Sequence, residues 1–163
     1  MDAPSIQPLT LADRDWARAL IRERWGAPEI VTRGRIHCAP ELSGFVARIA
    51  GRPAGLVTYA IERSECEVVS LDSLRSGCGV GTRLLDAVCS AARDAGCRRV
   101  WLITTNDNVH ALAFYQKRGF ELVAVHRGAL EESRRLKPSI PLVGLDGIPL
   151  RDEIELELAL IRQ

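Results

Sequence analysis

Three glycines at alternate positions, Gly77, Gly79 and Gly81, constrain the fold of this 163-residue chain more than any other feature. The segment before them, Glu65 to Leu74, is strand-like, and the segment after them repeats apolar residues at helical spacing as far as Gly96. Glycine lets the backbone approach a ligand closely, and the free N–H groups at a helix start favour an anion. The sequence therefore predicts a strand–loop–helix unit that binds phosphate.

Two common phosphate-binding loops do not fit these glycines. A P-loop requires a lysine directly after its last glycine, and no lysine follows here. A dinucleotide-binding G-x-G-x-x-G pattern starts at Gly77 and Gly79 but has Thr82 at its third glycine. A nucleotide-dependent oxidoreductase is therefore disfavoured, and the remaining alternative is a glycine turn that only lets the helix pack.

The rest of the chain predicts a mixed α/β fold. Its first half reads as a short strand over 6–9, a helix from the N-cap Thr10 to Trp25, and an antiparallel meander. Its second half alternates strands and helices, so at least one right-handed crossover joins parallel strands. No pattern identifies residues 29–43. The predicted meander and later elements are strands at 45–50, 54–62, 65–74, 100–105, 120–126 and 153–161 and a helix at 108–118.

Composition excludes several classes of protein. The 22 basic and 21 acidic side chains leave a formal charge of +1, which argues against a nucleic-acid binder. We expect one domain over residues 1–163, with no membrane span, no secretory signal and a cytoplasmic location. Five cysteines form no C-x-x-C pair, and with three histidines they complete no metal-ligand spacing, so no metal is expected.

A second motif, NVHALAFYQKRGF, occupies residues 108–120, one strand after the glycine helix. With the glycine loop it resembles the GNAT superfamily of N-acetyltransferases over nearly the whole chain. The family loop pattern [Q/R]-x-x-G-x-[G/A] finds its glycines at Gly79 and Gly81, whereas its Gln or Arg position falls on Ser76, one residue after Arg75. The downstream pattern N-x-x-A-x-x-F-Y-x-K-x-G-F is matched by Asn108, Ala111, Phe114, Tyr115, Lys117, Gly119 and Phe120.

The resemblance implies the GNAT fold, a mostly antiparallel sheet of about six or seven strands flanked by helices, with one parallel strand pair that splays. It implies transfer of an acetyl group from acetyl-CoA to a primary amine, on a small molecule or a peptide, by direct attack in a ternary complex. A non-catalytic acetyl-CoA-binding module is the alternative. The implied cofactor-binding residues are Leu71, Asp72, Ser73, Ser76, Gly77, Cys78, Gly79, Val80, Gly81, Thr82, Asn108, Ala111, Phe114 and Lys117.

Two residues match family positions with catalytic roles. Tyr115 would protonate the leaving CoA thiolate, and Glu67 would accept the proton of the amine. The alternatives are a buried aromatic for Tyr115 and a solvated strand carboxylate for Glu67. Strand alternation places Glu67 on the same face as Val69, Leu71 and Ser73. The rival bases are His110, which we expect to be a solvated helix residue, and His126.

Two further features lead to expectations. Residues 127–152 form a long connection between the last two strands, with three prolines and three glycines, and we expect it to select the acceptor. The alternatives are a rigid loop or a contact between two copies in a homodimer. Cys78 lies at a helix start, where the dipole favours a thiolate, so we expect it to be the most reactive thiol.

Overall fold

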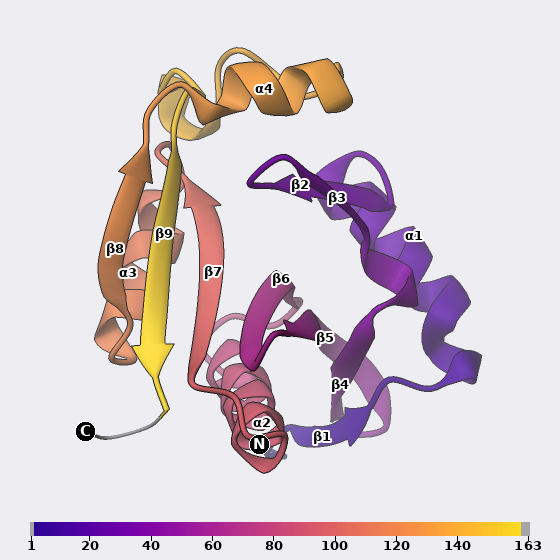
Figure 1. The fold of residues 1–163 in the computed structure, drawn as a ribbon. Helices are drawn as coiled ribbons and strands as arrows, with labels where there is room; N and C mark the ends of the chain where they lie inside the picture. The colour runs from indigo at the N-terminus through magenta and orange to yellow at the C-terminus, as the bar shows by residue number, and fades with distance from the viewer. Residues whose placement is uncertain (1, 161–163) are drawn as a thin grey trace.

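A seven-stranded sheet with the order β1-β4-β5-β6-β7-β9-β8 organises the chain in the computed structural model, which describes residues 2–160 (Figure 1). Only β6 and β7 run parallel, and every other neighbouring pair is antiparallel. The predicted mixed, mostly antiparallel sheet is therefore confirmed. Its strands are β1 (Ser5–Pro8), β4 (Ser43–Ile49), β5 (Arg52–Glu62), β6 (Glu65–Ser73), β7 (Arg99–Thr105), β8 (Glu121–His126) and β9 (Glu153–Ala159).

Helices cover both faces of the sheet (Figure 1). On one face, α2 (Val80–Asp94) buries Leu84 and Val88 against the strands, and α3 (Val109–Lys117) contributes to the same core. On the other face, α1 (Arg14–Trp25) buries its apolar side in a second core. No helix of residues 2–160 is long and apolar enough to cross a membrane.

The start and end of α1 follow the sequence signals. Thr10 and Asp13 form a capping box, in which the Asp13 carboxylate accepts from the Thr10 amide at 3.1 Å. The Thr10 hydroxyl also donates to this carboxylate, at 2.9 Å. A short 3-10 turn, Leu11–Asp13, precedes the helix. At its end Gly26 adopts a left-handed φ of 80°, which terminates the helix.

The segment without a sequence pattern forms a small separate hairpin of β2 (Glu29–Thr32) and β3 (Arg35–Cys38). Its two-residue turn, Arg33 and Gly34, has positive φ at both positions, which suits the twist of a tight hairpin. Neither strand pairs with the main sheet. The hairpin instead stands over the sheet on the side of α1 (Figure 1).

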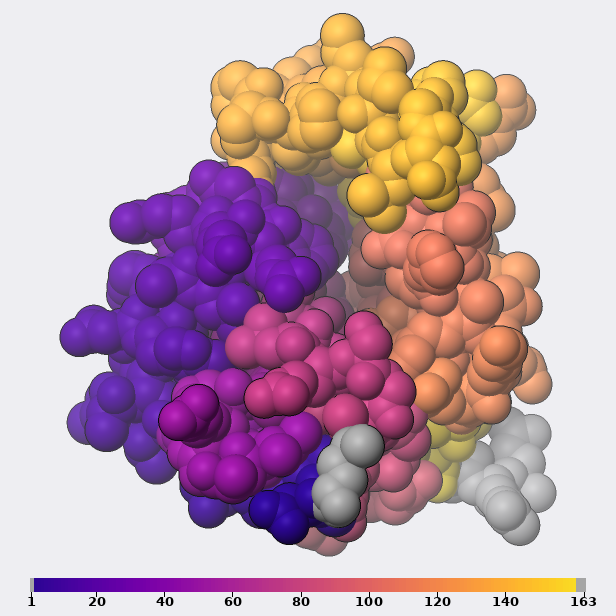
Figure 2. Space-filling view, turned by 180° about the vertical axis from the view of Figure 1, so that it is seen from behind, coloured from indigo at the N-terminus to yellow at the C-terminus, as the bar shows by residue number. Residues whose placement is uncertain are grey.

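The long connection between β8 and β9 contains a helix that the sequence pattern did not identify, α4 (Ala129–Leu136). This helix contacts β2. Directly after it, the Lys137 ammonium donates to the backbone carbonyls of Trp25 at 3.1 Å and Glu29 at 2.9 Å. The connection therefore bridges the two halves of the molecule, and Figure 2 shows it, coloured orange to yellow, above a hollow between them.

A β-bulge in β6 changes which face its side chains occupy. Thr58 of β5 pairs with Ser70, but the next residue, Tyr59, pairs with Val68, so Val69 is the extra residue. As a result, Leu71 packs with the core under α2, while Glu67 lies on the face of the β2–β3 hairpin. The prediction that simple alternation keeps Glu67 and Leu71 on one face is wrong, because the bulge adds a half-period between them.

Candidate active site

A cleft of about 690 Å³ opens between the C-terminal end of β6, the glycine loop and α3. The parallel ladder between β6 and β7 ends at Val68 and Leu102, so the rest of β6 separates from its neighbour. The lining of the cleft includes most of the predicted cofactor-binding residues: Leu71, Ser73, Ser76, Gly77, Gly79, Val80, Gly81, Thr82, Ala111, Phe114 and Lys117. The sequence motifs are therefore brought together around one space.

Gly79 and Gly81 require glycine for different structural reasons. Gly79 is a lining residue of the cleft and the N-cap of α2, with a left-handed φ of 71°, and an added Cβ would meet nothing within 4 Å. Gly81 has ordinary backbone angles, but a Cβ there would lie 3.2 Å from the Phe114 ring. Gly79 thus allows the turn into the helix, while Gly81 allows α3 to pack closely against α2.

Cationic side chains surround the cleft, which suits a phosphate ligand. Arg75, Lys117 and Arg118 all line it. Arg118 lies over the Phe114 ring, with its guanidinium carbon 3.6 Å from the ring centroid, and its Nε donates to the Thr82 hydroxyl at 2.8 Å. No sequence signal pointed to Arg118, because it follows the matched motif position Lys117 and is not itself a matched position.

Tyr115 lines the deep side of the cleft and is 8% exposed. Its ring makes edge contacts with Phe114 and Phe120, at centroid distances of 5.1 Å and 5.5 Å. Burial, together with the nearby Asp72 carboxylate, raises the pKa of the Tyr115 phenol. The phenol is therefore protonated at neutral pH and is a hydrogen-bond donor.

Three predicted cofactor-binding residues are absent from the cleft lining. Asp72 lies on the α1 side, where its carboxylate accepts from the Trp25 indole at 3.1 Å and burial raises its pKa. Asn108 caps α3, accepting from the Ala111 amide at 3.0 Å. Cys78 is half-buried, with its sulfur 3.6 Å from the Ser76 carbonyl oxygen, whereas another thiol, that of Cys38, is exposed.

A second pocket, of about 560 Å³, lies on the opposite face of the sheet. Its floor is a row of residues in direct register on three neighbouring strands, Ala60, Glu67 and Trp101. Charged side chains form its rim: Arg35, Glu62, Arg63 and Glu65. The bulge therefore lets one strand, β6, line the cleft with Leu71 and Ser73 and the second pocket with Glu67.

Glu67 is 4% exposed and has two side-chain partners from the β2–β3 hairpin. The Thr32 hydroxyl donates to its Oε1 at 2.6 Å, and His37 Nε2 lies 3.3 Å from its Oε2. The alternative interpretation of Glu67 as a solvated strand carboxylate is therefore wrong. No sequence signal pointed to Thr32 or His37, since the hairpin that carries them had no recognisable pattern.

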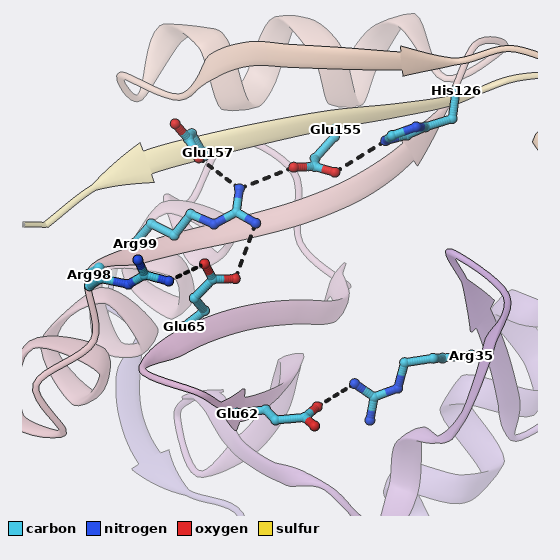
Figure 3. Close-up of polar contacts among 8 residues, drawn as sticks. All are labelled: Arg35, Glu62, Glu65, Arg98, Arg99, His126, Glu155 and Glu157. Atoms are coloured by element: carbon cyan, nitrogen blue, oxygen red, sulfur yellow. Dashed lines mark hydrogen bonds and ion pairs between the residues drawn. The ribbon is translucent and has the colours of Figure 1, made fainter.

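An ion-pair network borders the second pocket and joins β6 and β7 at the end where the two strands are paired (Figure 3). Arg99 of β7 pairs with Glu65 of β6 at 3.2 Å and, on β9, with Glu155 at 3.1 Å and Glu157 at 2.7 Å. These carboxylates raise the pKa of the Arg99 guanidinium despite its partial burial. The network links three strands at the end where β6 and β7 are still paired.

The two rival histidines have different positions. His126 Nε2 lies 3.2 Å from Glu155 Oε1, at the β8 end of the ion-pair network (Figure 3). His110 is exposed on α3 and borders the first cleft, on the opposite face from Glu67. Residues 2–160 contain no group of His, Cys, Asp and Glu side chains that could hold a metal ion.

Comparison with known proteins identifies the family. Residues 11–120 match the acetyltransferase (GNAT) family. The chain belongs to this family. It is 49% identical to the uncharacterized protein YdhI of Bacillus subtilis (strain 168) over 133 residues, which cover 81% of this chain and 83% of that protein.

Solved structures share the GNAT fold. An IAA acetyltransferase from Bacillus cereus matches with a TM-score of 0.74 at 22% identity, over 97% of this chain and all of that one. A GNAT family acetyltransferase from Elizabethkingia anophelis, crystallised with acetyl-CoA, matches with a TM-score of 0.69 at 18% identity, over 98% of this chain and all of that one. The predicted family, fold, enzyme class and co-substrate are thus confirmed.

Proposed function

We propose that this GNAT protein transfers the acetyl group of acetyl-CoA to a primary amine in a ternary complex, with the two substrates on opposite faces of the sheet. The observation that carries the proposal is the bulged strand β6, which contributes to a cationic cleft on one face and to a pocket with a buried carboxylate on the other. Such a strand gives each of two substrates a pocket of its own.

The first cleft suits acetyl-CoA. The N–H groups in the first turn of α2 have no partner within the helix, and they favour a pyrophosphate together with Arg75, Lys117 and Arg118. The part of β6 beyond Val68 has left the β7 ladder, so one backbone edge is available for the amide groups of the pantetheine arm. The aromatic ring of Phe114 supplies an apolar wall.

The second pocket suits the amine. An ammonium entering it would meet Glu67, which takes its proton so that the free nitrogen can attack the thioester carbon. The carbon–sulfur bond then breaks, and the leaving sulfur receives the proton of the Tyr115 hydroxyl. The second proton that the attacking nitrogen loses as it becomes an amide restores the Tyr115 hydroxyl through solvent, and Glu67 releases the first proton to solvent. The products are an N-acetylated amine and CoA. The segment 127–152, with α4 above the hairpin, selects among acceptors in this proposal.

Binding and turnover are measured separately to test the proposal. Isothermal titration measures acetyl-CoA affinity, and release of the CoA thiol measures turnover with spermidine, phenethylamine, L-lysine and a peptide with a free amino terminus. Mass spectrometry then identifies the acetylated nitrogen. We expect binding and turnover with at least one amine. Binding without thiol release from a broad amine and peptide library would instead support the non-catalytic module.

A further inference from the structure

The β2–β3 hairpin brings two polar side chains to the buried carboxylate of Glu67. Thr32 is 5% exposed, as is His37, and both lie on the side of the hairpin that faces the sheet. The three side chains form a closed group, because Thr32 Oγ1 also lies 3.1 Å from His37 Nε2. A buried group in which each member contacts the other two is held in one arrangement.

The hydrogen-bond directions in this group follow from the number of available protons. The Thr32 hydroxyl has one hydrogen, which it donates to Glu67 Oε1 at 2.6 Å. It therefore cannot also donate to His37, so the 3.1 Å contact requires a hydrogen on His37 Nε2. The same N–H faces Glu67 Oε2 at 3.3 Å. Glu67 Oε1 thus accepts a hydrogen bond from the hairpin, and Oε2 has the His37 ring beside it.

We propose that Thr32 and His37 are positioning residues that hold the Glu67 carboxylate in the orientation in which it accepts the proton of the acceptor amine. A carboxylate has about four acceptor positions, and the contacts with Thr32 and His37 occupy at most two of them, which leaves others for a ligand in the second pocket. This inference rests on the proposed function, because Glu67 has a proton to accept only if an amine reacts there.

The hairpin itself is anchored in a way that keeps these donors in place. The Arg33 amide at its tip donates to Glu153 Oε2 at 3.0 Å, and the other oxygen of this buried carboxylate accepts from the Ser133 hydroxyl of α4 at 3.2 Å. Arg35 pairs with Glu62 on β5 (Figure 3). The hairpin is thereby attached to β9, α4 and β5, and its own Arg35 lines the second pocket.

A double-mutant cycle tests the inference. In the otherwise unchanged protein, Thr32→Val and His37→Ala are expected to lower kcat about 10- to 100-fold, since a displaced catalytic group costs rate of this order. The dissociation constant of acetyl-CoA should not change. In a Glu67→Gln background, which itself loses about 100-fold or more, the same substitutions should change kcat less than twofold.

Conservative variants and a variant at a neighbouring position distinguish the positioning of Glu67 from a general loss of folded structure. Thr32→Ser keeps the hydroxyl and His37→Gln keeps an N–H donor, so both should recover most of the lost rate. Ile36→Ala, at an exposed position of the same hairpin, should leave kcat unchanged. Each variant is checked by urea unfolding, which reports folding independently of rate.

The outcomes distinguish this inference from the function on which it rests. Turnover that His37→Ala and Thr32→Val leave unchanged, or reduce equally in the Glu67→Gln background, would overturn the positioning role and keep the acetyltransferase. Absence of thiol release with every amine of the panel, in the presence of normal acetyl-CoA binding, would overturn both.

Discussion

Gly79 and Gly96 have nearly the same left-handed backbone, with φ of 71° and 75°, and an added Cβ meets nothing within 4 Å at either position. Gly79 begins α2 in the cleft lining, whereas Gly96 follows the end of the same helix, away from the cleft. Alanine at each position therefore imposes the same backbone penalty, of about 1–2 kcal/mol, on the free energy of unfolding. Only alanine at position 79 also adds a methyl group where we expect the pyrophosphate.

The affinity for acetyl-CoA should separate the two variants. A methyl group that displaces the phosphate from one N–H removes a charge-assisted hydrogen bond, which contributes about 1.5–3 kcal/mol. At about 1.4 kcal/mol for each tenfold change, Gly79→Ala should raise the dissociation constant by about 10- to 150-fold. Gly96→Ala should leave it within about twofold.

Isothermal titration with acetyl-CoA measures this difference, and urea unfolding of both variants measures the shared backbone penalty. Equal dissociation constants in two equally destabilised variants would refute the reasoning, since the phosphate would then lie elsewhere. A Gly79→Ala protein that lost far more stability than Gly96→Ala would also contradict it, because the open space around both positions predicts similar costs.

Three other predictions concern the cleft and the core. Tyr115→Phe should lower turnover by about 10- to 10⁴-fold while the affinity for acetyl-CoA is nearly kept. The matched control Tyr59→Phe, outside the cleft, should not lower turnover. Unchanged turnover in Tyr115→Phe would mean that another group or water protonates the thiolate. Brief iodoacetamide treatment, followed by peptide mapping, should show label on Cys38 and Cys78. The three buried thiols should stay unlabelled, because burial raises their pKa. CoA should protect Cys78 only, and equal labelling of Cys78 with and without CoA would argue against a cofactor that covers the loop. Leu156→Ala, at a fully buried position of β9, should lower the free energy of unfolding by about 2–5 kcal/mol in urea, and a loss below 1 kcal/mol would mean that the site collapses around the cavity.

Local sequence signals predicted the first cleft well. The glycines around Gly79 and the segment 108–120 each demand a specific backbone or packing geometry, and the spacing between them matches one helix and one strand. Eleven of the fourteen predicted cofactor-binding residues line one space for this reason. The others have contacts that depend on tertiary neighbours, such as Asp72 with the Trp25 indole.

The second pocket depended on long-range structure. The bulge at Val69 is a mismatch in the pairing of β5 and β6. Alternation along β6 alone would place Leu71 on the face of Glu67, whereas Leu71 packs in the core under α2. The sequence did not predict helix α4, because it lies in a segment rich in proline and glycine. Its position above the hairpin depends on contacts with β2 and on the hydrogen bond from the Lys137 ammonium to the Glu29 carbonyl.

What the sequence by itself determined is the chemistry of the donor side: a glycine loop before a helix and a matched second motif, which define the family and its co-substrate. Such signals are readable because the residues concerned act through their own backbone, within one turn of each other. Only the tertiary structure decided the surroundings of Glu67. Its partner Thr32 lies 35 residues away on a hairpin without a pattern of its own, and a hydrogen bond between two such side chains leaves no local periodicity to read.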